Sequence, residues 1–291
     1  MFVAIVGAGN MGAAMASRLL AAGHRLRAWN RSQEKLKPLV DKGAEAADSL
    51  LALAEAEVII SMLADDDAVR GVLIRDGLLT AMRPGTIHVI MATVSVALVR
   101  EIAPLHTARG VLYVSAPVLG RPDAAAAGKL NILAAGAPDA IDRLQPLFDV
   151  LGQKTWRFGE QPEKANIVKL AANMMLACAI EAIGETAQLV RSHGVAPKDF
   201  VEMLTNTLFA APAYKTYGTL IAEERFSPAG FKLPLGLKDV RLTLAAGDAA
   251  HVPLPFASIL RDNFLDAIAN GDADLDWSAL ANVAKRRAGA K

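Results

Sequence analysis

The first residues that could do chemistry are three glycines spaced as G-x-G-x-x-G near the start of the chain. Gly7 permits a tight turn after an apolar run, Gly9 lets the backbone approach a phosphate, and Gly12 lets a following helix lie close to a sheet. Backbone N–H groups in the first turn of that helix attract an anion. The loop, which also contains Asn10 and Met11, is therefore predicted to bind the pyrophosphate of a dinucleotide.

A second polar segment, Asn30-Arg31-Ser32, follows the next apolar run. Sites for NAD usually carry Asp or Glu at this point, where the carboxylate accepts a hydrogen bond from the ribose 2′-hydroxyl. Asn30 and Ser32 are neutral instead, and the planar guanidinium of Arg31 can pair with a 2′-phosphate. We therefore predict a preference for NADP (NADPH in the reductive direction), with NAD used less well. The alternative is that Arg31 is a solvated turn residue.

A nicotinamide site also needs a group that handles the proton accompanying hydride transfer, and one apolar segment offers it. Asn166, Lys169 and Asn173 are spaced i, i+3 and i+7, which puts them on one face of an otherwise apolar helix. Loss of ammonium solvation there should lower the pKa of Lys169 toward the working range of a general acid/base. Asn173 is predicted to bind the substrate or to orient the lysine. The alternative is a lysine that extends to solvent and an asparagine that packs between helices.

The elements that must position these residues alternate between strand and helix up to residue 163. Apolar runs typical of buried strands lie at 2–6, 25–29, 58–62, 86–90, 112–115 and 131–135, with a last edge strand at 155–158. Such alternation predicts an α/β fold, a Rossmann domain whose doubly wound sheet is parallel. We assign residues 1–163 to this dinucleotide-binding domain.

From residue 164 onward the pattern is helical. Residues 164–191 form one run that would span about 42 Å as a helix. That is too long for a crossover within the first domain, so it predicts a long interdomain helix. The remaining residues form helical segments divided by glycines and prolines. Residues 164–291 are therefore predicted to form an all-α C-terminal domain that includes the long helix.

Composition excludes several classes of protein. The 31 Lys and Arg residues balance 30 Asp and Glu residues, which leaves no basic field for nucleic acid. The single cysteine, Cys178, permits no disulfide framework, and with the short N-terminal apolar run it predicts a cytoplasmic protein. Lys169 and Asn173 interrupt the most apolar segment, 167–183, which favours a buried helix over a membrane span. The histidines are scattered without metal-ligand spacing, so no metal site is predicted.

Four ordered motifs resemble the β-hydroxyacid dehydrogenase family, the group of 3-hydroxyisobutyrate dehydrogenase, tartronate semialdehyde reductase and the glyoxylate and succinic semialdehyde reductases. They are GAGNMGAAMASRLLAAGH from residue 7, SAPVLGRPDAAAAGKLNIL at 115–133, the K-x-x-x-N of Lys169 and Asn173, and GLKDVRLTLAAG at 236–247 followed by VPLP at 252–255. The resemblance runs nearly end to end. It implies that Lys169 is the general acid/base and that Asn173 is a substrate ligand.

The second motif departs from the family, which usually reads D-A-P-V-S-G-G and holds the substrate carboxylate with its serine and glycines. The matching positions here begin at Ser115 and end in Leu119, Gly120 and Arg121. Leu119 cannot donate a hydrogen bond. Arg121 can replace that anchor with a bidentate pair if it turns inward, or it can be a solvated loop residue. The resemblance therefore implies substrate contacts at 119–121 and leaves open a substrate larger or more apolar than a small hydroxy acid.

The resemblance implies three further cofactor contacts. Leu63 ends a strand beside the cofactor, Thr93 matches a threonine near the nicotinamide, and Lys238 reaches the site from the α-domain. The usual serine before that threonine is Ala92 here. The alternative for Lys238 is an exposed helix residue paired with Asp239 or a neighbouring acid.

These residues predict an NADP-dependent oxidoreductase that interconverts a carbonyl, as a semialdehyde or keto acid, and a hydroxy acid. Its partners would be small molecules, not nucleic acid or membrane, and the family implies a homodimer or homotetramer. One alternative is an imine reductase on the same scaffold, although such enzymes commonly carry another residue where Lys169 stands. Another is an NADP-binding protein without catalysis. The physiological substrate and the direction of the reaction stay open.

Overall fold

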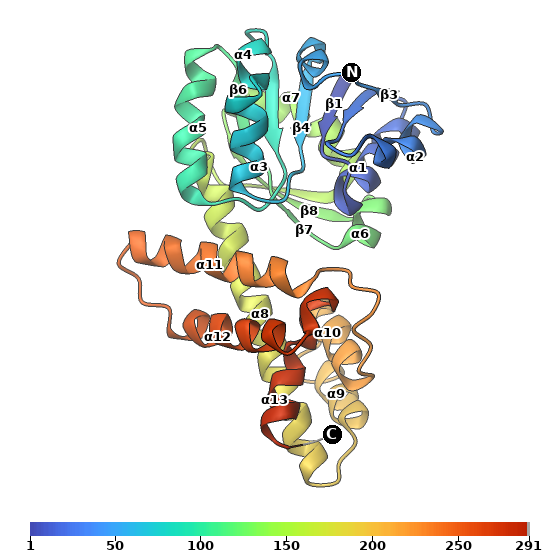
Figure 1. Ribbon diagram of the computed structural model, residues 1–291, viewed down its shortest axis with the longest axis vertical. Coiled ribbons are helices and arrows are strands. Elements are labelled where there is room, and N and C mark those ends of the chain that lie inside the picture. Colours follow the sequence, from blue (N-terminus) through green and yellow to red (C-terminus); the bar gives the residue numbers. More distant parts are fainter. Residues whose placement is uncertain (290–291) are drawn as a thin grey trace. The chain divides into compact units, whose positions relative to one another are not determined.

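The computed structural model describes residues 1–289, so the last two residues of the predicted domain 164–291 lie outside the described residues. The chain forms two compact units, Met1–Lys169 and Leu170–Lys291. They divide within one continuous helix, α8 (Glu163–Ser192), after residue 169, whereas the predicted boundary lay after residue 163, where this helix begins. The first unit is an α/β domain and the second is helical (Figure 1), which confirms the predicted fold class.

A nine-stranded sheet forms the centre of the first unit within the described residues. Its strands are β1 (Phe2–Val6), β2 (Arg25–Trp29), β3 (Glu45–Ala46), β4 (Val58–Ser61), β5 (Ile87–Ile90), β6 (Leu112–Ser115), β7 (Val118–Leu119), β8 (Leu130–Gly136) and β9 (Gly152–Arg157). They lie in the order β3-β2-β1-β4-β5-β6-β8-β7, and β9 pairs with β8. Strand order reverses between β1 and β4, and at such a switch point doubly wound folds bind ligands beside the carboxyl ends of the strands.

Helices cover both faces of this sheet (Figure 1). They are α1 (Asn10–Ala21), α2 (Lys37–Val40), α3 (Asp66–Arg70), α4 (Leu78–Ala81), α5 (Val96–Ala108), α6 (Pro122–Ala126) and α7 (Pro138–Leu151), with the 3₁₀ segments η1 (Gln33–Leu36) and η2 (Leu50–Glu55) and the π-helical segment η3 (Gly71–Arg75). Residues of β1 alternate between two apolar clusters, because Val3 and Ile5 enter one while Ala4 and Val6 enter the other. A strand buried on both faces is apolar throughout, which explains the continuous apolar run.

The sheet differs from the predicted parallel arrangement at β8. This strand runs antiparallel to β6 and β7 and parallel to β9. A parallel crossover usually carries a helix across the face of the sheet. The connection from β6 to β8 contains only the five-residue helix α6 and the two-residue strand β7. The chain therefore turns back at this point instead of crossing the sheet.

The second unit packs helices around the C-terminal part of α8. They are α9 (Pro197–Thr205), α10 (Pro212–Ala222), α11 (Leu233–Ala249), α12 (Pro255–Ala269) and α13 (Ala281–Arg287), with the 3₁₀ turns η4 (Asp272–Asp274) and η5 (Trp277–Leu280). Helices α9 to α12 each carry a proline in the first turn, where its missing N–H has no partner to lose. Ala177 and Ile180 of α8 pack with Phe264 and Trp277 in the core of this unit.

Helix α8 contains 30 residues and is long and apolar enough to cross a membrane by length and composition. The core helix of a soluble protein passes the same test, and 44% of the most apolar window of α8 is buried inside the structure. Ala165 is fully buried in the first unit, and Ala177 and Ile180 are fully buried in the second. The helix therefore contributes core residues to each unit.

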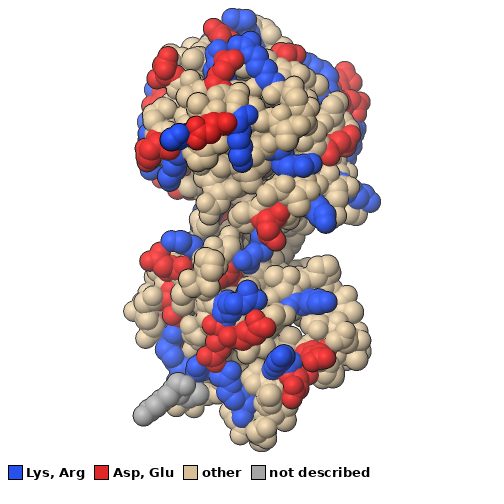
Figure 2. Space-filling view, turned by 90° about the vertical axis from the view of Figure 1, so that its right-hand side faces the viewer, with Lys and Arg blue, Asp and Glu red and all other residues tan. Residues whose placement is uncertain are grey.

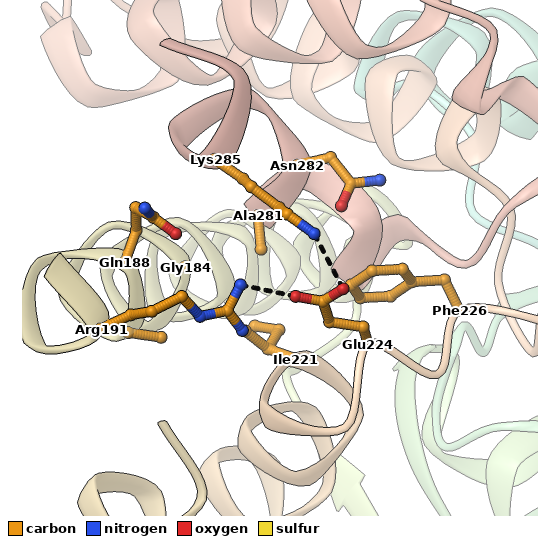
Figure 3. A pocket seen from close by; sticks show the side chains of 10 residues that line it. Gly184, Gln188, Arg191, Ile221, Glu224, Phe226, Ala281, Asn282 and Lys285 are labelled. Atoms are coloured by element: carbon orange, nitrogen blue, oxygen red, sulfur yellow. Dashed lines mark hydrogen bonds and ion pairs between the residues drawn. The ribbon is translucent and has the colours of Figure 1, made fainter. Parts of the chain in front are cut away.

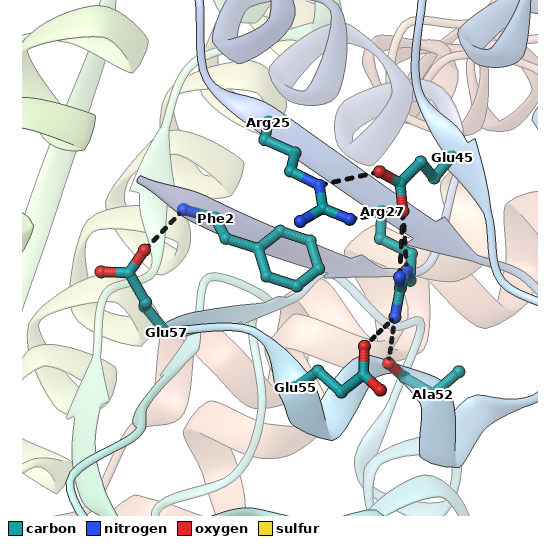
Figure 4. Close-up of polar contacts among 7 residues, drawn as sticks. All are labelled: Phe2, Arg25, Arg27, Glu45, Ala52, Glu55 and Glu57. Carbon is teal, nitrogen blue, oxygen red and sulfur yellow. Dashed lines mark hydrogen bonds and ion pairs between the residues drawn. The ribbon is translucent and has the colours of Figure 1, made fainter.

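Charged side chains of both signs lie close together on the surface that Figure 2 shows. On the face shown in Figure 2, Lys and Arg side chains lie among Asp and Glu side chains. One such group joins β2, β3 and η2 in the first unit (Figure 4), where Arg27 donates to Glu45 at 3.0 Å and to Glu55 at 2.8 Å. Arg25 donates to the same Glu45 at 2.8 Å, and its guanidinium lies 4.4 Å from the centre of the Phe2 ring. This network links β2 to β3 and η2.

Candidate functional site

The glycine loop connects β1 to α1, and its three glycines have different roles. Gly7 has a φ of +98°, and a Cβ atom there would lie 2.3 Å from the carbonyl oxygen of Met62. A Cβ atom on Gly12 would lie 2.0 Å from the carbonyl oxygen of Gly7. A Cβ atom on Gly9 would meet no atom within 4 Å, and Gly9 is the N-cap of α1 without a side-chain cap. The loop therefore leaves open space beside the first turn of α1, with Asn10 and Met11 at its start, which fits a pyrophosphate.

Asn30 joins this glycine loop to the segment that follows β2. Its Oδ1 accepts a hydrogen bond from the Ala8 N–H at 2.9 Å, and its Nδ2 donates to the Ser32 carbonyl at 2.9 Å. Arg31 is exposed and forms no hydrogen bond or ion pair with another of residues 1–289. The Asn30 amide thus shapes two loops, which the sequence did not reveal. Contacts of Asn30, Arg31 and Ser32 with the cofactor stay predictions.

Leu63 and Thr93 follow β4 and β5, at the same edge of the sheet as the glycine loop. The Cδ2 atom of Leu63 lies 3.2 Å from where a Cβ atom on Gly7 would be. The Ser95 N–H donates to Asp66 Oδ1 at 2.9 Å, and the Ser95 hydroxyl donates to Oδ2 at 2.5 Å. These bonds join the starts of α3 and α5. They hold in place the loops that carry Leu63 and Thr93.

The 119–121 segment follows β6, and its three residues have different environments. Leu119 packs against a small apolar cluster formed by Leu133, Ala135 and Ala165. Gly120 has a φ of +143°, and a Cβ atom there would lie 2.6 Å from Leu130 Cδ2. Arg121 is half-buried at the N-cap position of α6, with its Nη1 shielded from solvent. Packing thus accounts for Leu119, and the predicted substrate contacts of the segment stay untested.

Lys169 is the last residue of the first unit and lies in the early turns of α8. Its exposed fraction is 8%, and that of Asn166, one turn earlier, is 1%. The Ser115 hydroxyl donates a short hydrogen bond to Asn166 Oδ1, and Asn166 Nδ2 donates to the Val94 carbonyl at 3.3 Å. Asn166 and Lys169 of the expected polar face are therefore buried, and Asn166 is bonded to β6 and to the loop that follows β5.

Asn173 lies one turn further along α8, in the second unit. Its Nδ2 donates to Asp239 Oδ2 at 2.6 Å, and Lys238 Nζ lies 3.4 Å from Asp239 Oδ1. Asp239 is 2% exposed, and the Thr243 hydroxyl donates to the Asp239 carbonyl oxygen at 2.8 Å. Lys238 therefore has the ion-pair partner that the alternative interpretation expected. A role for Lys238 in binding the cofactor stays a prediction.

A buried polar chain that the sequence did not reveal runs through the first unit. Ser61 Oγ lies 2.8 Å from His88 Nε2, His88 Nδ1 lies 2.8 Å from His106 Nε2, and His106 Nδ1 lies 2.8 Å from the Ile102 carbonyl. Because a carbonyl only accepts, each ring donates through Nδ1 and accepts through Nε2, and the Ser61 hydroxyl donates. Burial lowers the pKa of His88 well below its usual value and lowers the pKa of His106 to about 4.

The described residues contain no group of three or more His, Cys, Asp or Glu that could hold a metal ion. A small hollow, open to solvent, lies in the second unit among α8, α10 and α13 (Figure 3). Glu224 accepts there from Arg191 Nη1 at 2.6 Å and from Lys285 Nζ at 2.9 Å. None of the predicted site residues lines this hollow. The pairing of Glu224 with both cations identifies a link between helices rather than a substrate site.

Comparison with known families assigns both parts of the chain to nicotinamide enzymes. A family model described as the NAD binding domain of 6-phosphogluconate dehydrogenase matches residues 2–159. A second, described as NAD-binding of NADP-dependent 3-hydroxyisobutyrate dehydrogenase, matches residues 164–284.

Individual relatives agree with these families along nearly the whole chain. An uncharacterized oxidoreductase of Bacillus subtilis, YfjR, is 42% identical over 98% of this chain and 100% of its own length. Glyoxylate/succinic semialdehyde reductase 1 of Arabidopsis thaliana is 32% identical over 98% of this chain and 99% of its own. A 3-hydroxyisobutyrate dehydrogenase of Mycobacterium tuberculosis, solved with L-serine, has a TM-score of 0.87 at 29% identity and covers 97% of this chain and 98% of its own. An imine reductase from Pseudomonas sp. has a TM-score of 0.65 at 26% identity, covering 97% and 98%.

Proposed function

The chain belongs to the β-hydroxyacid dehydrogenase family of NAD(P)-dependent oxidoreductases that act on CH–OH groups, and from this premise we propose its finer activity. We propose that it uses NADPH to reduce a carbonyl, as a semialdehyde or keto acid, to a hydroxy acid, and runs the reverse oxidation with NADP. The observation that carries the proposal is Lys169, a lysine that is only 8% exposed and lies on the helix shared by both units.

The preference for NADP rests on the end of β2. The 2′-phosphate would meet Arg31, which is exposed and has no protein partner among residues 1–289, at the point where an NAD site carries a carboxylate. Asn30 keeps the neighbouring turn in shape, because its amide bonds to both loops. Gly7, Gly9 and Gly12 would hold the pyrophosphate.

Lys169 supplies the proton in this proposal. When bound, the nicotinamide supplies the hydride that reaches the carbonyl carbon. As the C=O π electrons move to oxygen, Lys169 Nζ donates a proton to that oxygen and becomes a neutral amine, which solvent later reprotonates. In the oxidative direction the neutral amine accepts the hydroxyl proton. Asn173 and the Gly120 backbone would hold the substrate, and Asp239 orients the Asn173 amide.

The substrate class is proposed from the 119–121 segment. Leu119 turns its side chain to an apolar cluster and offers no hydrogen bond, whereas Arg121 can pair with a carboxylate. We propose a carboxylate-bearing aldehyde or ketone that receives no side-chain hydrogen bond from position 119. We also propose that the protein is cytoplasmic and that it forms a homodimer or homotetramer. Light scattering of the purified chain would test the oligomeric state.

The experiment that tests the catalytic role compares two lysines of α8. Lys169→Ala should lower kcat by about 10²–10⁴-fold, the range that general acid catalysis supplies, with NADPH binding by fluorescence quenching retained. The matched control is Lys164→Ala, which removes an exposed lysine from the same helix. Near-normal turnover of Lys169→Ala would refute the assignment.

An imine reductase is the second candidate, because a structure with that activity covers 97% of this chain. Lys169 argues for carbonyl chemistry, since a lysine proton suits an alkoxide. A panel of semialdehydes, keto acids and cyclic imines, each with NADPH and NADH, decides between them. Turnover of cyclic imines alone would reverse the choice, and NADPH binding without any turnover would favour a non-catalytic protein.

A further inference from the structure

Asn166 is the one residue of the polar face of α8 to which the proposed mechanism gives no role. It is 1% exposed, and its amide group is bonded at both ends. Oδ1 accepts from the Ser115 hydroxyl, and Nδ2 donates to the Val94 carbonyl at 3.3 Å. Both partners are fully buried, so water does not compete for these bonds.

The partners determine the orientation of the amide. The Val94 carbonyl can only accept, so the NH₂ end must face it. The oxygen end then faces Ser115, whose hydroxyl must donate. A rotated amide would place two acceptor oxygens against each other at Val94. The side chain of Asn166 can therefore make both hydrogen bonds in only one orientation. Both bonds form only when α8 keeps its present rotation about its own axis.

Each of the three bonded segments leads directly into predicted site residues. Val94 follows Thr93, which is expected beside the nicotinamide. Ser115 begins the segment that reaches Leu119 and Arg121, where substrate contacts are expected. Asn166 itself lies at i−3 from Lys169, on the same face of the helix. One amide thus connects the cofactor, substrate and acid/base positions within the first unit.

Apolar packing supports the same connection. Leu119 lies against the cluster that contains Ala165, and Val168 of α8 packs on that cluster too. Ala165 and Val168 flank the Asn166 position along α8. The 115–121 segment is therefore held to the start of α8 by a hydrogen bond at one end and by side-chain packing at the other.

We propose that Asn166, held by Ser115 and Val94, is a positioning residue that fixes the Lys169 ammonium relative to the cofactor and substrate segments. This inference rests on the proposed role of Lys169. Because proton and hydride transfer need the reacting atoms within a few tenths of an ångström of their productive places, a small rotation of α8 lowers the rate without weakening binding. The expected signature is a loss in kcat with KM and NADPH affinity retained.

The test compares Ser115→Ala and Asn166→Leu with Ser115→Thr, which keeps the hydroxyl donor. Ser115→Ala and Asn166→Leu should lower kcat by about 10–100-fold while the Kd for NADPH stays within about two-fold. The deuterium isotope effect measured with NADPH labelled at the transferred position should rise, because the chemical step becomes slower. Ser115→Thr should retain most of the wild-type kcat.

A core variant separates positioning from loss of stability. Ile141→Val removes one methylene from a buried side chain of α7, a helix that carries none of the predicted site residues, and should lower Tm while leaving kcat and the isotope effect unchanged. If Ser115→Ala and Asn166→Leu lower Tm but leave kcat and the isotope effect at wild-type values, while Lys169→Ala is inactive, the positioning role is wrong and the proposed function stands. If Lys169→Ala stays active, the proposed function itself fails.

Discussion

Helix α8 carries one buried asparagine into each unit, and the two are held in opposite electrostatic settings. Asn166 in the first unit bonds to a hydroxyl and a backbone carbonyl, both neutral. Asn173 in the second unit donates to the Asp239 carboxylate, which is 2% exposed and lies beside Lys238. A neutral bond aligns groups at little electrostatic cost, whereas a buried carboxylate depends on every donor it has. The first setting suits positioning, and the second makes stability depend on charge.

The same contrast appears in the titrating groups of the two units. Buried imidazoles of the first unit have lowered pKa values, since burial disfavours their charged form. In the second unit, burial and the nearby Glu185 raise the pKa of Glu181 to about 7. The units should therefore respond to pH in opposite directions.

The largest expected effect is acid destabilisation of the first unit. The unfolded chain protonates His106 near pH 6.5, but the folded chain does so only near pH 4. The stability that neutral His106 contributes is fully present above pH 6.5 and is lost as pH falls toward 4. The loss is on the order of 3 kcal/mol for this residue alone. Urea unfolding followed by the fluorescence of Trp29 and Trp156 measures it. His88→Leu/His106→Leu should flatten the slope, and His251→Gln, at an exposed histidine, should not. An unchanged slope in the double variant would contradict the assignment.

The next largest effect is expected when the hydrogen bond between Asn173 and Asp239 is removed. Asn173→Leu leaves the buried Asp239 carboxylate without its 2.6 Å donor and should lower the free energy of unfolding of the second unit by about 2–3 kcal/mol. Asn173→Leu/Asp239→Leu removes both partners and should recover much of that loss. Urea unfolding with Trp277 as the only tryptophan reports on this unit. Equal losses in the single and double variants would show that packing, not the bond, is responsible.

A smaller and opposite effect is expected at Glu181, which accepts from Asn263 at 2.6 Å. Its pKa of about 7 in the folded state exceeds the value of 4.5 expected when unfolded, so stability falls as pH rises from 4.5 to 7. Glu181→Gln should raise the stability of the second unit by about 1–2 kcal/mol at pH 8, after allowing for partial solvent screening, and leave it unchanged below pH 4.5. Thermal unfolding across pH checks this, with the exposed Glu202→Gln as control. A gain that is the same at every pH would rule out titration as its cause.

The smallest effects should come from the two charged networks of Figures 3 and 4. Glu224→Gln removes the partner of Arg191 and Lys285 and should cost less than about 1 kcal/mol, because the pairs face solvent. Glu55→Gln, at a carboxylate that is more exposed than that of Glu224, should have a smaller effect. Both losses should shrink in about 1 M NaCl, measured by thermal unfolding. A salt-independent loss at Glu224 would instead implicate its backbone, which has a φ of +49°.

Several elements were predictable because their signals are local. Strands β1, β2 and β6 have the expected bounds. Strand β1 is a continuous apolar run, as expected of a strand buried on both faces, whereas β2 alternates buried Leu26 and Ala28 with two arginines. The two-residue strands β3 and β7 carry no such run and were missed. The antiparallel direction of β8 was also missed, because an apolar run has the same composition in either direction. Only the short connection through α6 decides it.

The candidate site also has features that could be predicted from the sequence and features that could not. The glycine loop and the polar face of α8 were readable, because G-x-G-x-x-G and i, i+3, i+7 spacings are short-range patterns with a known geometry. The position of Arg31 at the end of β2 could be predicted from the same strand–loop–helix–strand pattern. The bond between Asn30 and the Ala8 N–H, 22 residues apart, had no such pattern.

The sequence by itself therefore determined the family, the fold class and which side chains carry the proposed chemistry. The tertiary structure decided what holds them. Ser115 meets Asn166 across 51 residues, Asn173 meets Asp239 across 66, and His88 meets His106 across 18. A hydrogen bond needs its two heavy atoms within about 3.5 Å of each other. Only the folded backbone brings such distant residues that close, so partners, burial and pKa values could not be read from spacing.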